Sequence, residues 1–365
     1  TLMRSSAASD VYKRQFSYFC NYGLNVRERQ RAEINPMQYG TIVHYILERF
    51  FGEYTKEEYL SLEEDKFQKI VCAYLAEYAV KYFGEEQLES NSFTYRLKTI
   101  LDNVMYLMKH IMEELSQSEF FVADCELKIG EDIPSYTIVL PDGHKIAVCG
   151  SVDRVDIMQR ADITYLRIID YKTGTKQFKL SDILYGINLQ MLLYLHSIEA
   201  SGGDKYGEIV PAGILYMPAT VPYISSDSLK SIDKLPDELN KKLKMNGLLL
   251  KDTEIIHGMD KTDAATYIPV KIKAGEPVSS TSLATLAEFG KIFKKVDMLI
   301  AEMGKNIYNG NIEAKPLKGG HDSCEYCPYD SVCAYRQSNP ITCFSVDNKT
   351  VIEEITNEIN GKEEE

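Results

Sequence analysis

The sequence lacks any run of the roughly 20 apolar residues that a membrane-spanning helix needs. No stretch has the long apolar core of a secretory signal peptide either. We therefore predict a soluble, cytoplasmic protein with no membrane partner. Basic residues are also few, because 41 Lys and Arg stand against 54 Asp and Glu, a net charge of −13. This balance argues mildly against nucleic acid as a partner, since phosphate binding usually rests on a basic surface.

Two kinds of catalytic motif are missing as well. No G-x-x-x-x-G-K-[S/T] loop is present, which argues against ATP hydrolysis by this chain. No Ser/His/Asp or Cys/His arrangement stands out. What is present is an ordinary globular composition, with 44% hydrophobic and 26% charged residues in 365. The length suits about two or three domains.

Apolar spacing and turn residues divide the chain into segments of different character. Strand patterns occupy 121–129, 135–140, 145–157, 163–172 and 209–217, and a helix is expected over 181–200. The expected segments are a non-native or disordered leader (1–15), a helical part (16–120) with a helix opening at Asn35-Pro36, a core (121–220), a polar insertion with weak structure (221–278), an amphipathic helix (279–318), a cysteine segment (319–343) and an acidic tail (344–365) that is disordered from Gly361.

Acidic residues near the ends of two neighbouring strands form the strongest candidate site. Asp153 ends the motif Gly-Ser-Val-Asp, and Asp170 and Lys172 belong to Ile-Asp-Tyr-Lys-Thr-Gly. Residues two apart on a strand share a face, so Asp170 and Lys172 point one way and Tyr171 the other. If the strands pair, the two carboxylates meet, and a cation such as Mg²⁺ or Mn²⁺ relieves their repulsion. With a lysine to orient water, this set is sufficient for phosphodiester hydrolysis.

The alternative for these strand residues is a solvated strand face with a weak ion pair.

Helical residues offer further contacts to the site. Gln190 and Tyr194 lie four apart and hence on one helix face, although an ordinary half-buried pair fits the spacing equally well. His44 follows Gly40 by one turn, and a glycine there would let the helix approach a sheet closely.

Three cysteines near the C-terminus form the second constellation, a C-x2-C-x5-C cluster of Cys324, Cys327 and Cys333. Such a cluster in a reducing compartment favours metal binding, but three ligands are one short of a closed site. His321 would complete a zinc site. Cys343 is a second local candidate, whereas distant Cys20 would suit an iron–sulfur cluster that ties the two chain ends together.

Taken in order, G-T-I-V-H, G-S-V-D, I-I-D-Y-K-T-G, Q-M-L-L-Y and the cysteine cluster resemble the RecB-like branch of the PD-(D/E)xK nucleases. Within it, the chain resembles the C-terminal nuclease domain of AddB/RexB subunits of bacterial ATP-dependent helicase/nucleases, from about Phe16 to Cys333. The resemblance implies an α/β, restriction-endonuclease-like core of a mixed central sheet flanked by helices, with residues 121–220 as the catalytic core. It also implies a Mg²⁺-dependent DNA exonuclease that acts in end resection for double-strand break repair and recombination, with an AddA-type helicase as its partner.

The resemblance also assigns roles to single residues. It implies that His44, Asp153 and Asp170 lie at the metal, to which we add the Tyr171 carbonyl, and that Lys172 is the catalytic lysine. Gln190 and Tyr194 match a helix beside the site, and Glu126 an auxiliary acidic residue. Three ligands of a [4Fe–4S] cluster match Cys324, Cys327 and Cys333.

The first cluster cysteine of the family opens a Cys-Pro segment, where this chain has Arg14-Gln15. We therefore expect an incomplete cluster, and a fragment whose leader replaces the native segment. Two other functions stay open: a stand-alone RecB-like nuclease of the CRISPR-adaptation type, and a non-catalytic zinc-binding module for DNA or protein. Zinc at the three cysteines and His321, without nuclease activity, would favour the second.

Overall fold

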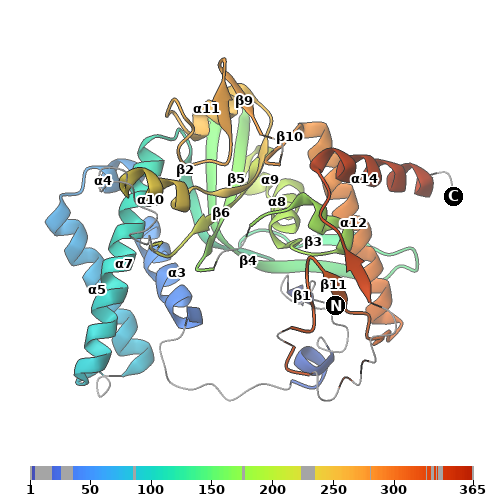
Figure 1. Cartoon of the computed structure of the whole chain (residues 1–365), viewed down its shortest axis with the longest axis horizontal. Coiled ribbons are helices and arrows are strands. Elements are labelled where there is room, and N and C mark those ends of the chain that lie inside the picture. Colours follow the sequence, from blue (N-terminus) through green and yellow to red (C-terminus); the bar gives the residue numbers. More distant parts are fainter. Residues whose placement is uncertain are drawn as a thin grey trace.

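The computed structural model describes residues 2–4, 19–25, 36–84, 88–174, 177–222, 235–279, 281–325, 327–329, 333, 335 and 340–363. Its centre is a mixed sheet flanked by helices (Figure 1), so the predicted α/β class is confirmed. None of the described helices combines the length and hydropathy that a bilayer span requires.

The central sheet is built around β4, by far its longest strand. The strands of this sheet, in the order in which they lie across it, are β1 (Leu2–Arg4), β4 (Lys145–Arg160), β5 (Ile163–Lys172), β6 (Glu208–Pro218), β7 (Asn246–Leu250) and β10 (Leu283–Ala284). Two more strands, β2 (Phe121–Ile129) and β3 (Tyr136–Val139), pair antiparallel with successive parts of β4. β4 and β5 are antiparallel, whereas β5 and β6 are parallel. A parallel pair needs a crossover, which a helix provides here.

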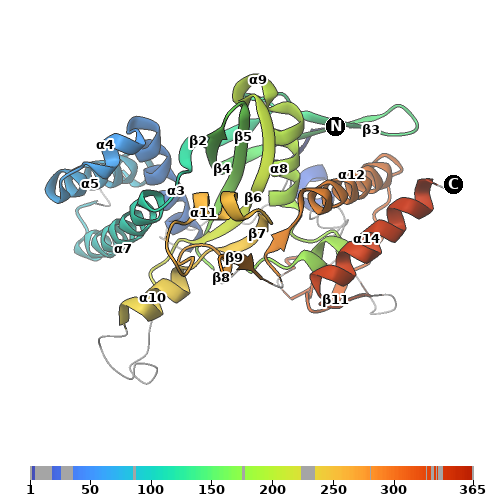
Figure 2. The same cartoon turned by 90° about the horizontal axis from the view of Figure 1, so that it is seen from above.

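Helices cover both faces of this sheet (Figure 2). On one side lie α3 (Pro36–Glu53), α4 (Lys56–Leu60), α5 (Glu64–Phe83) and α7 (Asn91–Ser116), and on the other α8 (Gln190–Ser201), α12 (Leu286–Tyr308) and α14 (Asn348–Glu363). Shorter elements are η1 (Phe19–Gly23), η2 (Leu180–Tyr185), α9 (Gly203–Tyr206), α10 (Leu235–Leu243), α11 (Thr253–Met259), and the strand pairs β8 (Lys271–Lys273) with β9 (Glu276–Val278) and β11 (Leu317–Gly319) with β12 (Ile341–Cys343).

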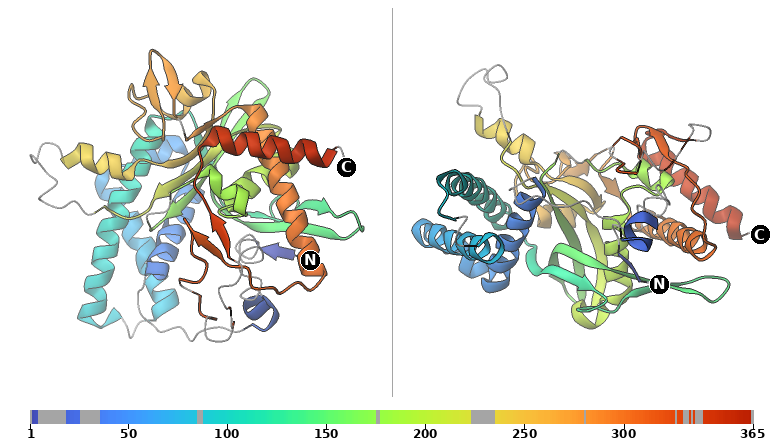
Figure 3. Two further views of the ribbon diagram at one scale, coloured as in Figure 1. Left: turned by 45° about the vertical axis from the view of Figure 1, so that its right-hand side comes forward. Right: turned by 90° about the horizontal axis from the view of Figure 1, so that it is seen from below.

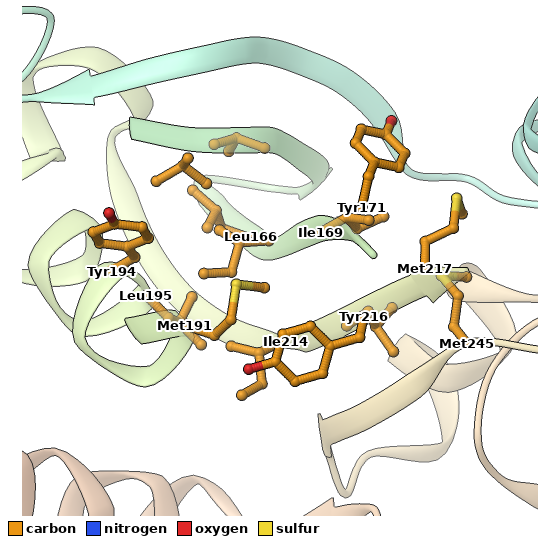
Figure 4. Packing of buried hydrophobic residues seen from close by; sticks show 14 of the residues in the cluster. Leu166, Ile169, Tyr171, Met191, Tyr194, Leu195, Ile214, Tyr216, Met217 and Met245 are labelled. Atoms are coloured by element: carbon orange, nitrogen blue, oxygen red, sulfur yellow. The ribbon is translucent and has the colours of Figure 1, made fainter. Parts of the chain in front are cut away.

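Apolar periodicity explains how the helices pack. Ile42, Ile46 and Phe50, at four-residue steps on α3, have no exposed surface. On the other side of the sheet, Leu166 of β5 and Ile214 of β6 turn toward Met191 of α8, as Figure 4 shows. Each buried side chain of this kind stabilises the fold by about 1.5–3 kcal/mol relative to its exposed state. The helix predicted to open near Pro36 and the five predicted strands are confirmed within a few residues, and α12 occupies the middle of the segment 279–318, where an amphipathic helix is expected.

Two predictions in the middle of the chain are wrong. The helix expected over 181–200 is broken, because η2 ends at Gly186 in the left-handed region (φ 64°) and α8 begins only at Gln190. The segment 221–278 is not devoid of structure, since β7 belongs to the central sheet and pairs with β6. A Cβ at Gly247 would lie 2.0 Å from the Ile214 carbonyl oxygen, so the glycine permits this close pairing.

Predictions for the two chain ends also need correction. The acidic tail contains α14, which extends to Glu363, and Val351, Ile355 and Ile359 form a buried stripe along it. Figure 3 shows this helix crossing α12. In the expected leader, Leu2–Arg4 form β1, parallel to β4. The rest of residues 1–15, including Arg14 and Gln15, lies outside the described residues, as does Asn35.

Candidate active site

Asp153 of β4 and Asp170 of β5 lie on neighbouring strands. The strand register pairs Arg154 with Ile169, so the next step along the ladder brings Asp153 opposite Asp170. The backbone N–H of Tyr171 donates a hydrogen bond to Asp153 Oδ2 over 3.0 Å. Burial and the charge of Asp170 raise the pKa of Asp153 to about 7. Asp153 and Asp170 therefore lie opposite one another across the strand pair, and a common ion between them stays a prediction.

Asp170 and Lys172 share one face of β5, as their spacing predicts. The ammonium group of Lys172 forms an ion pair with Asp170 Oδ2, although this buried oxygen accepts no hydrogen bond within the described part of the chain. Tyr171 points to the opposite face, away from α8 (Figure 4). There the hydroxyl group of Tyr171 accepts a hydrogen bond from Arg154 Nη1 over 3.3 Å.

His44 of α3 reaches the carboxylates from the side. Its Nδ1 lies 3.1 Å from Glu126 Oε1 and its Nε2 3.6 Å from Asp153 Oδ2. Gly40, one turn earlier, lies beside Thr173, but an added Cβ would make only an ordinary contact of 3.7 Å. A glycine at this position allows the approach of helix and sheet, as expected, but the space left for a Cβ shows that the approach does not depend on it. His44 lies beside the carboxylates, as predicted.

His44 and Glu126 each stabilise the charged form of the other. Burial alone lowers the pKa of His44, but the hydrogen bond with Glu126 and the charges of Asp153, Glu126 and Asp170 raise it overall. Burial raises the pKa of Glu126, but hydrogen bonds from His44 and Ser151 bring it below its ordinary value. An imidazolium and a carboxylate that lie together each favour the charged form of the other.

Glu126 adopts a backbone conformation that is rare within a strand. Its φ is 50°, in the left-handed region, where a residue with a Cβ is strained. Its Oε2 accepts a hydrogen bond of 2.7 Å from Ser151 Oγ. Strained residues of this kind cluster at functional sites because the surrounding contacts hold them in place. Sequence analysis missed Ser151, although its spacing of two from Asp153 places it on the same strand face.

A hollow of about 720 Å³ opens above these residues, a size typical of ligand sites. Its lining residues come from α3, α5, β2, β4 and the end of β5, and they are Gly40, Thr41, His44, Tyr45, Glu48, Tyr78, Tyr82, Glu126, Lys128, Ser151, Tyr171, Lys172, Thr173 and Gly174. Asp153 and Asp170 are not part of the lining. Their side chains are 15% and 6% exposed, so they lie deeper than the imidazole of His44, which is 28% exposed.

The two predicted residues of α8 do not line the hollow in the part of the chain that the structure describes. Tyr194 is buried, and a Cβ at Gly150 would lie 2.2 Å from its hydroxyl oxygen. Gly150 of the Gly-Ser-Val-Asp motif therefore makes room for Tyr194 against β4. Gln190 is half-buried in the first turn of α8, the helix that connects the parallel strands β5 and β6. Roles for both residues stay predictions.

Behind the site lies a fully buried ionic network that sequence analysis missed. Arg154 donates to Asp156 and Glu114, and Arg167 donates to the same two carboxylates. All four side chains have 0% exposure. Arg154 directly follows Asp153, and it donates to the hydroxyl group of Tyr171, whose N–H binds Asp153. The network thus supports β4 and β5 where they carry the acidic residues.

The chemistry of the donor set suits a hard divalent cation. One ligand atom each of His44, Glu126 and Asp153 lies within 4.8 Å of the other two. Asp170 is not part of this triplet; its buried Oδ2 forms the ion pair with Lys172 but accepts no hydrogen bond from the described residues. Carboxylate oxygens are typical ligands of Mg²⁺ and Mn²⁺, whereas an imidazole is more often a ligand of other transition metals.

The cysteine segment approaches the beginning of the described chain. The η1 helix lies beside the C-terminal segment (Figures 1 and 3). Burial raises the pKa of Cys20, and the nearby thiolates of Cys327 and Cys333 raise it further. Burial also raises the pKa of Cys324, and the same two thiolates raise it further. Cys343 instead packs with Ile187 and Leu317 in a small apolar cluster.

Comparisons with known proteins identify the family of the chain. A family described as the PD-(D/E)XK nuclease superfamily matches residues 6–334. The B-type subunit of the ATP-dependent helicase/deoxyribonuclease of Thermoanaerobacter sp. (strain X514) is 34% identical over 332 residues, which cover 88% of this chain and 28% of the relative. The same proteins of Alkaliphilus oremlandii (strain OhILAs) and Clostridium kluyveri (strain NBRC 12016) are 32% and 34% identical, over 94% and 96% of this chain and 31% of each relative.

The chain thus spans less than a third of the length of these curated relatives. The family match, in contrast, extends over most of the chain and includes every residue of the acidic site. The chain belongs to the PD-(D/E)XK nuclease superfamily.

Proposed function

We propose that this chain is a Mg²⁺-dependent DNA exonuclease domain that hydrolyses phosphodiester bonds. The observation that carries the proposal is the convergence of His44, Glu126 and Asp153 within 4.8 Å, with Asp170 and Lys172 on the adjoining strand. Like charges at this spacing disfavour one another unless a proton or a cation neutralises them. Burial, and after it the charge of Asp170, raise the pKa of Asp153 to about 7, a shift that a bound cation would oppose.

We assign the metal-holding role to His44, Asp153, Asp170 and the carbonyl group of Tyr171. A bound divalent ion would polarise a phosphoryl oxygen and lower the pKa of a water. Lys172, which lines the hollow beside Asp170, would orient the attacking water through its ammonium protons. The Glu126 carboxylate fixes the imidazole of His44 through Nδ1, leaving Nε2 directed at Asp153. Gln190 and Tyr194 would position this arrangement from α8.

For the biological setting, we propose DNA end resection in double-strand break repair and recombination, with an AddA-type helicase as the partner. The support is the name of the relatives, which combines a helicase with a deoxyribonuclease. No observation on the described chain favours a stand-alone nuclease of the CRISPR-adaptation type. The non-catalytic zinc module is less well supported, because it leaves the acidic group unexplained.

For the cysteines, we propose that Cys20 joins Cys324, Cys327 and Cys333 as the fourth ligand of a [4Fe–4S] cluster. The support is the electrostatic proximity of Cys20 to Cys327 and Cys333.

The test is cleavage of end-labelled single- and double-stranded DNA, with Mg²⁺ and with EDTA. We expect Asp153→Asn to abolish Mg²⁺-dependent cleavage. Asp162→Asn is the matched control, because Asp162 is exposed in the turn between the same two strands. Cleavage by Asp153→Asn at the rate of the control, or cleavage by the wild type in EDTA, contradicts the proposal. Cleavage of circular DNA, which has no ends, contradicts the proposal that the enzyme is an exonuclease.

A further inference from the structure

Three tyrosines form a row of rings along one wall of the hollow. Tyr45 belongs to α3, and Tyr78 and Tyr82 belong to α5; all three line the same hollow as His44 and Lys172. The ring centroids are 5.2 Å apart between Tyr45 and Tyr78, and 4.4 Å apart between Tyr78 and Tyr82. Because Tyr45 follows His44 in the sequence, the row begins next to the acidic site and leads away from it.

The row is fixed at its inner end and open at its outer end. The hydroxyl group of Tyr45 donates a 2.8 Å hydrogen bond to Glu77, and Tyr78 is only 5% exposed. Tyr82, in contrast, keeps 56% of its surface exposed. One face of this ring packs on Tyr78, and the ring also lines the hollow. Because an aromatic side chain stabilises a fold mainly through its buried part, the exposed part of Tyr82 is available to a ligand.

The depth of the site indicates what this ligand is. Asp170 is 4% exposed and lies beneath the hollow, so a phosphodiester has to enter the hollow to reach it. A nucleotide that enters loses its stacking contacts with neighbouring bases. Aromatic side chains replace such contacts in proteins that bind single strands, and they do so for any base because every base has a π-face.

The charges around the row fit a nucleic-acid backbone better than an apolar partner. The ammonium group of Lys81 lies 5.1 Å from the ring centroid of Tyr82, and Lys128 and Lys172 line the hollow. Glu48 and Glu126 line it as well, so the hollow is not a general anion site. Rings flanked by a few lysines are typical of sites that combine base stacking with backbone contacts.

We propose that Tyr78 and Tyr82 form a base-stacking subsite that holds single-stranded DNA as it enters the hollow. This inference rests on the proposed nuclease function and extends it by naming the strand state of the DNA and the residues that bind it. Tyr82 supplies the exposed face, and Tyr78, held by Tyr45, supports it from behind. Within duplex DNA the bases are stacked on one another, so only the two terminal base pairs offer a free face to this ring.

The chain contains no tryptophan, so Tyr82→Trp introduces a single fluorescent reporter at the subsite. Phe344→Trp is the matched control, since Phe344 is 65% exposed and lies beside β12 at the other end of the molecule. Each variant is titrated in EDTA with a single-stranded oligonucleotide and with the same sequence as a blunt duplex. Anisotropy of labelled DNA, measured in parallel, establishes that each titration reaches saturation.

We expect the single strand to quench the fluorescence of Tyr82→Trp but not that of Phe344→Trp. No quenching of Tyr82→Trp at saturation, or equal quenching by the duplex, overturns the proposal. In a second measurement, we expect Tyr82→Ala to weaken single-strand binding by roughly 5- to 150-fold, the range for loss of one stacked base, and Tyr82→Phe to retain it. Equal affinities of both variants also overturn the subsite.

These outcomes are separate from those of the nuclease test. If stacking fails while Mg²⁺-dependent cleavage persists, the subsite is wrong and the proposed function stands. If the quenching is observed but Asp153→Asn cleaves like its control, the chain binds single strands and the catalytic proposal is wrong.

Discussion

The backbone N–H of Tyr171 donates a hydrogen bond to the carboxylate of Asp153, on the neighbouring strand. Tyr171 stands between Asp170 and Lys172 on β5, so this hydrogen bond orients the side chain of Asp153 on β4 toward the site residues of β5. Because the hydroxyl group of the same Tyr171 is held by buried Arg154, both ends of the residue are fixed. The acidic site is thus fastened to the sheet through backbone as well as side chains, as a site that must hold like charges together requires.

The left-handed backbone at Glu126 gives a first prediction. Glycine tolerates a φ of 50° without strain, whereas alanine does not. We expect Glu126→Gly to be more stable than Glu126→Ala by about 1 kcal/mol in urea unfolding, with cleavage reduced in both. Lys128, on the same strand without a positive φ, serves as the control and should show the reverse order, because glycine weakens an ordinary strand. The same order at both positions contradicts the assignment of strain.

The ionic network behind the site gives a second prediction. In Glu114→Gln, two fully buried guanidinium groups would share one remaining carboxylate. Removing one partner of a buried ion pair costs about 3–5 kcal/mol, because the other charge stays buried without compensation. We expect a loss of this size in the free energy of unfolding. Glu113→Gln, at an exposed position one residue earlier, should change it by less than about 0.5 kcal/mol. Similar losses in both variants would mean that the network does not stabilise the fold.

Stability should depend on pH through His196, which links α8 to α12. Burial lowers its pKa, but hydrogen bonds with Asp297 and Glu199 raise it to about 9 overall, from an ordinary 6.5. Because the folded value is the higher one, the stabilisation is complete below pH 6.5 and is lost as the pH rises through 9. We expect the free energy of unfolding to fall by about 3 kcal/mol over this window, and His196→Phe, which keeps the stacking on Phe293, to lack this part of the slope. Identical slopes would contradict the prediction.

The cysteine cluster is tested by iron content. After anaerobic reconstitution, we expect Cys20→Ser to lose iron as completely as Cys327→Ser does, because a [4Fe–4S] cluster uses four thiolates. Cys72→Ser is the control, since Cys72 lies on α5 outside the cluster. Full iron retention by Cys20→Ser excludes Cys20 as a ligand. One bound zinc per wild-type chain, with no iron, would favour the zinc module instead.

The parts of the structure that the sequence predicts are those that local patterns control. The two-residue period of a strand predicts that Asp170 and Lys172 share one face, and the four-residue spacing of apolar residues predicts which side of α3 is buried. Contacts between segments far apart in the sequence cannot be predicted from such patterns. The five residues of β7 carry no strand signal of their own, and their burial depends on pairing with β6. The proximity of Cys20 to Cys327 joins segments about 300 residues apart, a contact that no local pattern encodes.

The central claim is that the acidic side chains around Asp153 bind a divalent ion. Electron paramagnetic resonance of Mn²⁺ measures this directly, because Mn²⁺ prefers the same oxygen ligands as Mg²⁺. We expect wild type and Asp162→Asn to bind Mn²⁺ with equal affinity, and Asp153→Asn to bind it at least roughly 10-fold more weakly. Unchanged Mn²⁺ affinity and stoichiometry in Asp153→Asn would contradict this claim.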